Sequence, residues 1–129
     1  MNSQDIRQYT LLYVDDNIKS YDPLLEFLDE KGLKVYMARN GKRAIFKAER
    51  LKPDIILMDV FMPEMDGLEA YKVLKSQEET QEIPVIFMCS TALMEDEDFR
   101  QKFVGLEYVT LPIDLQNLWE RIAVHLKLT

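Results

Sequence analysis

Three aspartates stand directly after short apolar runs, a position from which carboxylates can gather into one reactive site. Asp15 and Asp16 follow the run Tyr9–Val14, and Asp59 follows the run Asp54–Met58. Each acid alone has an ordinary explanation, because Asp often ends strands and caps helices, as Asp15 or Asp16 would cap the helix that follows. Three carboxylates held together repel one another unless a cation or a proton lies between them. Mg²⁺ suits such a cluster, since it prefers oxygen ligands and keeps several waters.

These acids meet only if the two strands before them are neighbours, so the surrounding elements decide the site. Short apolar runs, typical of strands covered on both faces, alternate with amphipathic stretches of helical spacing. The runs predict strands at Tyr9–Val14, Leu33–Ala38, Asp54–Met58, Pro84–Met88 and Tyr108–Leu111. The other stretches predict a first helix from about Pro23 to Lys31-Gly32, then helices at Lys42–Lys52, Gly67–Ser76, Asp96–Val104 and Leu115–Leu126.

Strict alternation of five strands and five helices predicts an α/β fold with right-handed crossovers. We expect a doubly wound five-stranded parallel sheet in the order 2-1-3-4-5, with helices on both faces. In that order the first and third strands are neighbours where the strand order reverses, which is where ligands bind in such sheets. Asp15, Asp16 and Asp59 should therefore converge.

Bulk properties exclude several classes of function. The 129 residues fit one domain, which we place at residues 9–129 after an N-terminal extension at residues 1–8. A net charge of −7 argues against direct binding of nucleic acid. Cys89 and His125 are the only residues of their types, which excludes an internal disulfide and leaves almost nothing for a histidine-based zinc site. Because no apolar run reaches the ~20 residues of a membrane span and the start lacks a secretion signal, we expect no membrane association and a cytoplasmic location.

Two segments resemble the acidic motifs of the receiver domains of two-component response regulators. They are Leu11–Asp16 (LLYVDD) and Ile56–Gly67 (ILMDVFMPEMDG). The second is the more specific, because Met62-Pro63 and then Asp66-Gly67 follow Asp59 at the spacing of the family. Asn40-Gly41 and Pro84 also fit, and the resemblance extends from about Tyr9 to Leu126. It implies a flavodoxin-like fold.

The resemblance also implies a function. Asp59 would accept a phosphoryl group from the phosphohistidine of a histidine kinase or phosphotransfer protein. Asp16, Asp59 and the backbone carbonyl of Phe61 would ligate Mg²⁺, with Asp15 acting directly or through water. The phosphorylated protein would signal by binding a downstream protein through the surface of the fourth helix, fifth strand and fifth helix. It would be no enzyme beyond its own phosphorylation and dephosphorylation.

The chain departs from the family pattern in the fourth and fifth strands. Leu111-Pro112 stands where receivers usually carry Lys-Pro, so the cation that meets the phosphoryl group is replaced by an apolar side chain. A gap-free count places Cys89 where receivers have a hydroxyl, and an insertion would place Ser90 or Thr91 there; we favour Thr91 or Ser90. Tyr108 occupies the position of the family's aromatic switch residue, although core packing explains it equally well.

Two other functions compete with the phosphorylated switch. A degenerate receiver that acts as a phosphate-independent adaptor is favoured by Leu111 and disfavoured by the retention of Asp15, Asp16 and Asp59. A Mg²⁺-dependent phosphohydrolase of the haloacid dehalogenase type is disfavoured, because that class needs Asp-x-Asp on its first strand. Here Asp15 and Asp16 are adjacent.

Overall fold

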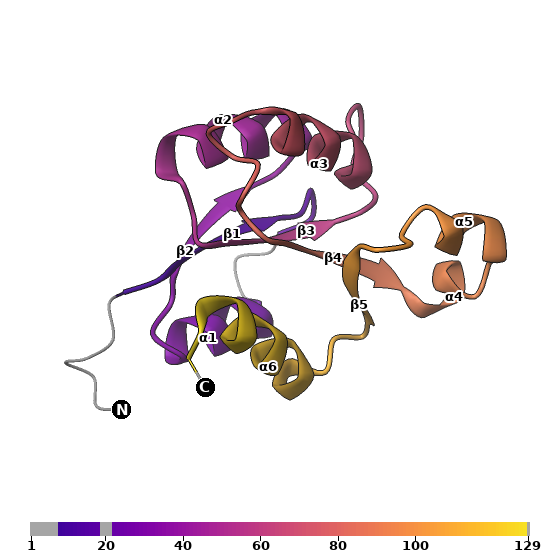
Figure 1. The fold of residues 1–129 in the computed structure, drawn as a ribbon. Helices are drawn as coiled ribbons and strands as arrows, with labels where there is room; N and C mark the ends of the chain where they lie inside the picture. Colours follow the sequence, from indigo (N-terminus) through magenta and orange to yellow (C-terminus); the bar gives the residue numbers. More distant parts are fainter. Residues whose placement is uncertain (1–7, 19–21, 129) are drawn as a thin grey trace.

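The computed structural model of the chain describes residues 8–18 and 22–128, so that most of the predicted N-terminal extension lies outside the described residues. Five parallel strands form one sheet in the order β2-β1-β3-β4-β5, which confirms the predicted fold (Figure 1). The strands are β1 (Thr10–Val14), β2 (Lys34–Ala38), β3 (Ile55–Asp59), β4 (Val85–Ser90) and β5 (Glu107–Leu111). The helices are α1 (Pro23–Glu30), α2 (Gly41–Leu51), α3 (Gly67–Ser76), α4 (Thr91–Met94), α5 (Glu97–Gln101) and α6 (Leu115–Leu126).

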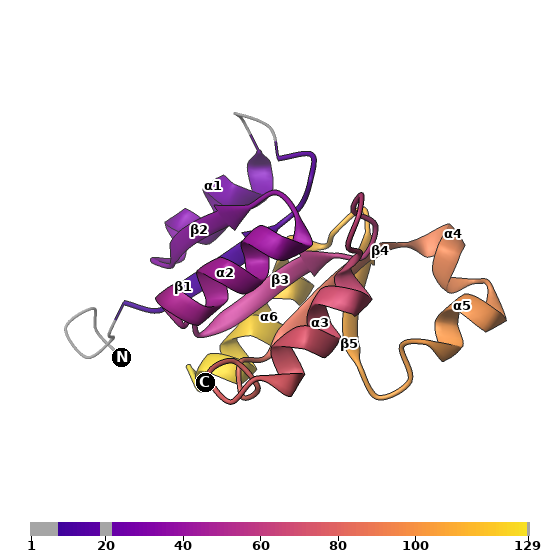
Figure 2. The ribbon, with the colours of Figure 1, turned by 90° about the horizontal axis from the view of Figure 1, so that it is seen from above.

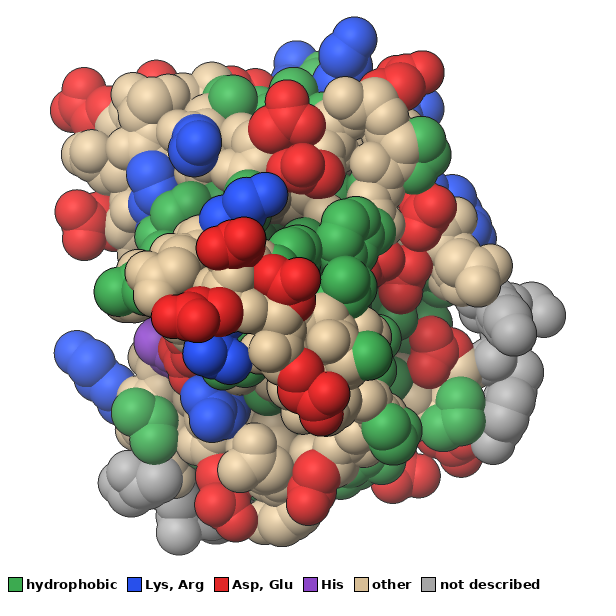
Figure 3. All heavy atoms as spheres, turned by 90° about the vertical axis from the view of Figure 1, so that its right-hand side faces the viewer, with side chains coloured by type: hydrophobic (Ala, Val, Ile, Leu, Met, Phe, Trp, Pro, Cys, Tyr) green, Lys and Arg blue, Asp and Glu red, His purple; other side chains and the backbone are tan. Residues whose placement is uncertain are grey.

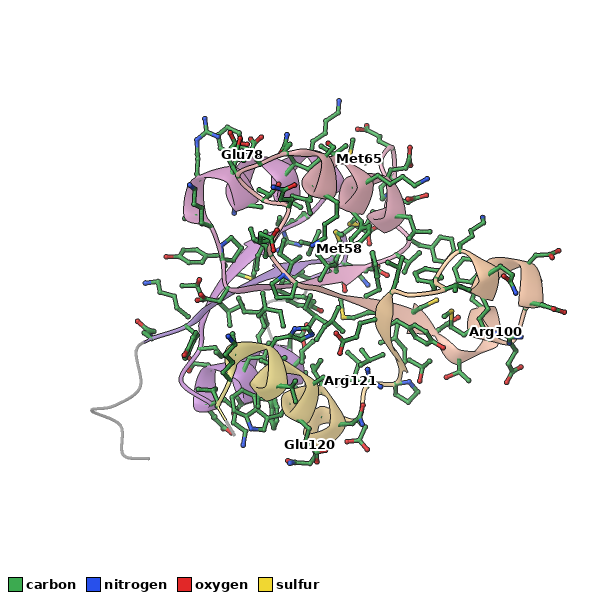
Figure 4. All side chains as sticks on the ribbon, in the orientation of Figure 1. Met58, Met65, Glu78, Arg100, Glu120 and Arg121 are labelled. Carbon is green, nitrogen blue, oxygen red and sulfur yellow. The ribbon has the colours of Figure 1, made fainter. Side chains whose placement is uncertain are left out.

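The central strands are buried on both faces and divide the core into two layers. Leu12 and Val14 of β1 belong to the layer between the sheet and α2 and α3, whereas Leu11 and Tyr13 belong to the layer beneath α1 and α6. This division follows from the two-residue period of a strand. Figures 1 and 2 show these two pairs of helices on opposite faces, and Figure 4 shows Met58 of β3 on the α2–α3 side.

Two signals at the ends of α1, Pro23 and Gly32, were predicted correctly. Pro23 occupies the first turn of α1, where its missing N–H is harmless. Asp22, and not Asp15 or Asp16, caps this helix. Gly32 has a φ of +88°, the left-handed conformation expected just after a helix end. Asp66 caps α3 in a reciprocal capping box with Glu69, which holds the start of α3 beside the end of β3.

The segment between β4 and β5 was predicted incorrectly. Instead of one helix at Asp96–Val104, two short helices follow β4, and both lie beside the β4–β5 edge of the sheet (Figures 1 and 2). The reason is a second cap: Ser90 accepts from the Leu93 N–H to begin α4, and Asp96 accepts from the Phe99 N–H to begin α5. β4 also continues two residues past its predicted end, because Ser90 pairs with Leu111 of β5.

Within residues 8–18 and 22–128, none of the helices is both long enough and apolar enough to cross a bilayer.

Candidate functional site

The three predicted acids meet at the carboxyl edge of the sheet. β1 and β3 pair in parallel, so their ends bring Asp15, Asp16 and Asp59 together. One carboxylate oxygen from each residue lies within 4.8 Å of the others. Carboxylates at this spacing repel in the absence of a cation and could share one hard metal ion. The convergence expected from the strand order is confirmed.

Asp59 sits in an environment that disfavours its charge. Burial, then the neighbouring charge of Asp15 and, to a smaller extent, that of Asp16 together raise the pKa of this half-buried carboxyl to about 6. The backbone N–H groups of Phe61 and Val60 oppose the rise, the former donating to Asp59 Oδ1 at 3.4 Å. A nearby cation would therefore stabilise the charged form of Asp59.

Asp15 is held at both of its carboxylate oxygens. The Asn17 N–H donates to Oδ1 at 3.0 Å, and the Tyr13 hydroxyl donates to Oδ2 at 3.2 Å. The same hydroxyl lies 3.4 Å from Oδ2 of Asp22, the cap of α1. Burial, and then the charges of Asp15 and Asp22, raise the pKa of Tyr13, so its hydroxyl stays protonated and remains a donor. Tyr13 was not predicted to be a site residue, and only the structure places its hydroxyl at the site.

The acids open into a pocket of about 320 Å³. Its acidic lining residues are Asp15, Asp59 and Asp22. The rest of the lining is largely apolar and includes Leu111, which is 40% exposed. The described residues that line the pocket include neither Lys nor Arg. The replacement of the usual lysine by Leu111 therefore leaves an apolar surface beside the carboxylates.

The candidate hydroxyls have other partners. Ser90 caps α4 by accepting from the Leu93 N–H at 3.2 Å, and Thr91 Oγ1 donates to the Leu111 carbonyl at 3.0 Å. Cys89 is buried; burial raises the pKa of its thiol, and the nearby charge of Asp59 contributes in the same direction. The assignment of Thr91 or Ser90 to the phosphoryl group stays a prediction.

Tyr108 is half-buried and packs against the α2–α3 layer of the core. Its ring meets that of Phe103 edge-on, with centroids 6.0 Å apart. Phe61, beside Asp59, is 51% exposed and stacks on Phe99 of α5 with centroids 5.6 Å apart. These ring contacts join the site loop to the segment that precedes β5, whereas the switch role of Tyr108 stays a prediction.

Gly67 allows the loop after β3 to fold back on the acceptor strand. A Cβ at this position would lie 2.5 Å from the Asp59 carbonyl oxygen and 3.0 Å from Val60 Cα, which is too close for any side chain. The Gly67 N–H also donates to the Val60 carbonyl at 2.8 Å. The Asp66-Gly67 pair thus closes the loop tightly over β3.

The carboxyl edge lies on the side of the molecule that carries α4 and α5. Figure 3, which faces this side, shows acidic side chains interspersed with hydrophobic ones. Val104 is 73% exposed, and Leu111 and Phe61 are also exposed. Arg100 lies on α5 and Arg121 on α6 (Figure 4). This surface offers apolar contacts among acidic and basic side chains.

Comparison with known proteins identifies the family. Residues 11–123 match the response regulator receiver domain. The chain is 34% identical over 118 residues to the polar-differentiation response regulator DivK of Brucella anthropi, covering 91% of this chain and 95% of that protein. It is also 32% identical over 127 residues, 98% of this chain, to a probable cyclic di-GMP phosphodiesterase of Vibrio cholerae, but it spans only 29% of that protein's length.

Solved structures agree with this result. The receiver domain of a signal transduction histidine kinase from Syntrophus aciditrophicus has a TM-score of 0.82 at 29% identity, covering 92% of this chain and 90% of that one. The receiver domain of a sensor histidine kinase from Pseudomonas aeruginosa has a TM-score of 0.75 at 27% identity, covering 91% and 96%. The latter holds a magnesium ion in its active-site cleft. The chain belongs to the response regulator receiver domain family, and its relatives support a phosphoryl-accepting signalling switch.

Proposed function

We propose that residues 9–129 form a receiver domain that accepts a phosphoryl group on Asp59 and signals by binding a partner protein. The observation that carries this assignment is the convergence of Asp15, Asp16 and Asp59 within 4.8 Å at the carboxyl ends of β1 and β3. Asp59 ends β3, and the loop that Gly67 closes follows directly. A carboxylate at a strand end, beside other acids that can hold a metal ion, is placed to act as a nucleophile.

Mg²⁺ is the proposed cofactor. The donor set fits a hard divalent cation, because it consists of carboxylate oxygens, and the pKa of Asp59 is raised first by burial and then by the charge of Asp15. Asp15, Asp16, Asp59 and the backbone carbonyl of Phe61 would hold the ion. When bound, Mg²⁺ supplies positive charge that lowers the repulsion between an anionic nucleophile and an anionic phosphoryl group.

The chain's own groups would then carry the transfer. A carboxylate oxygen of Asp59 attacks the phosphorus of a phosphohistidine, an O–P bond forms, and the P–N bond breaks with its electron pair passing to the imidazole. Asp59 becomes an acyl phosphate. The backbone N–H of Phe61, already donating to Asp59, helps to orient the attacking carboxylate. The hydroxyl of Thr91 or Ser90 is the proposed donor to the transferred phosphoryl group.

The proposed donor of the phosphoryl group is a histidine kinase or phosphotransfer protein. The proposed output is a protein bound through the surface of α4, α5, β5 and α6, where Val104 and Leu111 are exposed. The net charge of −7 supports binding of proteins and not of nucleic acid. We further propose a cytoplasmic location and no enzymatic activity beyond self-phosphorylation and self-dephosphorylation.

The acceptor can be tested by chemical phosphorylation. With Mg²⁺ and acetyl phosphate, the intact protein should gain the mass of one phosphoryl group, and borohydride reduction followed by peptide mapping should place it on Asp59. Asp59→Asn should abolish the label, whereas Asp66→Asn, which changes another carboxylate of the same loop and keeps the α3 cap, should not. A label on Asp15, Asp16 or a serine would refute the assignment. No label under any condition would favour the phosphate-independent adaptor.

A further inference from the structure

Tyr13 makes a contact to the acidic site that neither the sequence motifs nor the family assignment requires. Its ring is buried in the layer of the core beneath α1 and α6, with only 4% of the residue exposed. Tyr13 and Asp15 are two residues apart at the end of β1, so both side chains lie on the same side of the sheet. The length of the phenol carries its hydroxyl out of the core to the carboxylate.

The hydroxyl is placed between two carboxylates. It lies 3.2 Å from Oδ2 of Asp15 and 3.4 Å from Oδ2 of Asp22, and it has a single proton to donate. Asp22 already uses its other oxygen to accept from the Leu24 N–H at 2.9 Å, which begins α1. Tyr13 therefore joins the proposed metal ligand Asp15 to the first turn of α1 through one donor.

Asp15 is the acid of the cluster whose two oxygens both receive donors in the described structure. The Asn17 N–H meets Oδ1 and the Tyr13 hydroxyl meets Oδ2, so the rotation of the carboxylate is restricted from both sides. The backbone N–H is supplied by any residue at position 17 other than proline. The second donor, by contrast, is a side-chain hydroxyl, which only a tyrosine at position 13 supplies here. The ring of Tyr13 is fixed by its packing in the core.

We propose that Tyr13 is a positioning residue for the divalent metal site, which holds the Asp15 carboxylate in the orientation that binds Mg²⁺. This inference rests on the proposed function, because it takes Asp15 as a ligand or as a partner of a metal-bound water. Donors to a metal-ligating group fix its orientation before the ion arrives, and removing one typically lowers metal affinity by about 10- to 100-fold. Tyr13 acts through Asp15 and not on the ion itself.

Tyr13→Phe removes only the hydroxyl and keeps the ring that fills the core. We expect the Mg²⁺ dissociation constant, measured by calorimetry, to rise about 10-fold. The variant should fold, because the pocket beside Asp15 and Asp22 is open to water. Tyr36→Phe is the matched control: Tyr36 is a partly buried tyrosine of β2 that packs in the opposite layer of the core. It should leave Mg²⁺ binding unchanged.

Repeating the Tyr13→Phe measurement in a second variant, Asp22→Ser, separates two roles of Tyr13: positioning Asp15 and supporting α1. Asp22→Ser keeps a side chain that caps helices well but removes the second carboxylate near Tyr13. If Tyr13 acts through Asp15, Tyr13→Phe should weaken Mg²⁺ binding by the same factor in the Asp22→Ser protein. In the Mg²⁺-free proteins, Tyr13→Phe should also move the carboxyl ¹³C shift of Asp15 much more than that of Asp16.

The outcomes distinguish this inference from the function on which it rests. If wild-type protein binds Mg²⁺ and Tyr13→Phe binds it within about 2-fold as tightly, less than the loss expected of a ligand-orienting donor, the positioning role is overturned and the proposed function stands. If Tyr13→Phe has no effect on Mg²⁺ binding in the Asp22→Ser background, Tyr13 acts by supporting α1 through Asp22. That result would also overturn the positioning role. If wild-type protein binds no Mg²⁺, both proposals fail.

Discussion

At the scale of single residues, Asp59 carries the strongest consequence of the site's geometry. Its folded-state pKa of about 6 lies above the ordinary value of 3.8. As pH rises between these values, the unfolded chain loses the proton before the folded protein does. The folded protein is therefore destabilised progressively over this interval and bears a constant penalty at higher pH.

Asp59→Asn should remove this penalty. Without Mg²⁺ at pH 8, we expect the variant to be more stable than the wild type by about 1–2 kcal/mol, after allowing for solvent screening of a half-buried group. The difference should shrink toward zero only below the ordinary value of 3.8, at about pH 3, where both states of the wild type hold the proton. Denaturant unfolding at the two pH values measures it. Equal stability at pH 8 would contradict the unfavourable environment of the Asp59 carboxylate, which comes from its burial and from the charge of Asp15.

At the scale of elements, the link between the site and β5 is altered by Leu111. The Thr91 hydroxyl donates to the Leu111 carbonyl, so the end of β4 remains tied to the end of β5. The Leu111 side chain, however, cannot form a charge-assisted bond with a phosphoryl oxygen. A conformational change is driven only by a free-energy difference between the two states, and that bond would have supplied part of it.

Leu111→Lys should therefore strengthen the response of the surface around Tyr108. With saturating Mg²⁺ and beryllofluoride, an acyl-phosphate mimic, amide shifts near Tyr108 should change more in Leu111→Lys than in the wild type. Leu111→Met, which alters shape without adding charge, should behave like the wild type. A full response in the wild-type protein, with nothing gained by the lysine, would show that another group replaces it; the ring contacts from Phe61 through Phe99 and Phe103 are the candidates.

At the scale of the whole molecule, metal binding and folding are coupled. The three carboxylates come from segments more than 40 residues apart and meet only when β1 and β3 pair. An ion that binds the folded protein and not the unfolded chain stabilises the fold by about 2.7 kcal/mol at 100 times its dissociation constant. For a domain of this size, that corresponds to about 10 °C in Tm.

Mg²⁺ should raise the Tm of the wild-type protein by that amount, as followed by circular dichroism. Asp16→Asn and Asp59→Asn should each greatly reduce the rise, because either change removes a ligand and its charge. Glu78, an acid that Figure 4 shows far from the carboxyl edge, gives the control: Glu78→Gln should keep the full rise. An equal rise in all of these proteins would indicate nonspecific screening of the net charge of −7.

Much of the fold was predictable because its signals are local. The predicted bounds of α3 and α6 agree with the structure, since caps and helical periodicity act within a few residues. Strict alternation of strands and helices led to the observed strand order, and the strand order predicted the meeting of Asp15, Asp16 and Asp59. The acidic site was therefore predictable from residue types and strand ends.

Other features were decided only by the tertiary structure. Tyr13 and Asp15 are close in the chain, but the second carboxylate beside the Tyr13 hydroxyl, that of Asp22, is brought there only by the packing of α1 against the sheet. Leu111 could be recognised as a replacement for lysine, but its exposure beside Asp59 follows from the packing of β5 and α6 around the pocket. Two N-caps in close succession divided the segment after β4, where the apolar periodicity indicated one helix. The two caps are local signals that the apolar periodicity masked, whereas the exposure of Leu111 beside Asp59 joins segments far apart in the chain and arises only once the sheet has assembled.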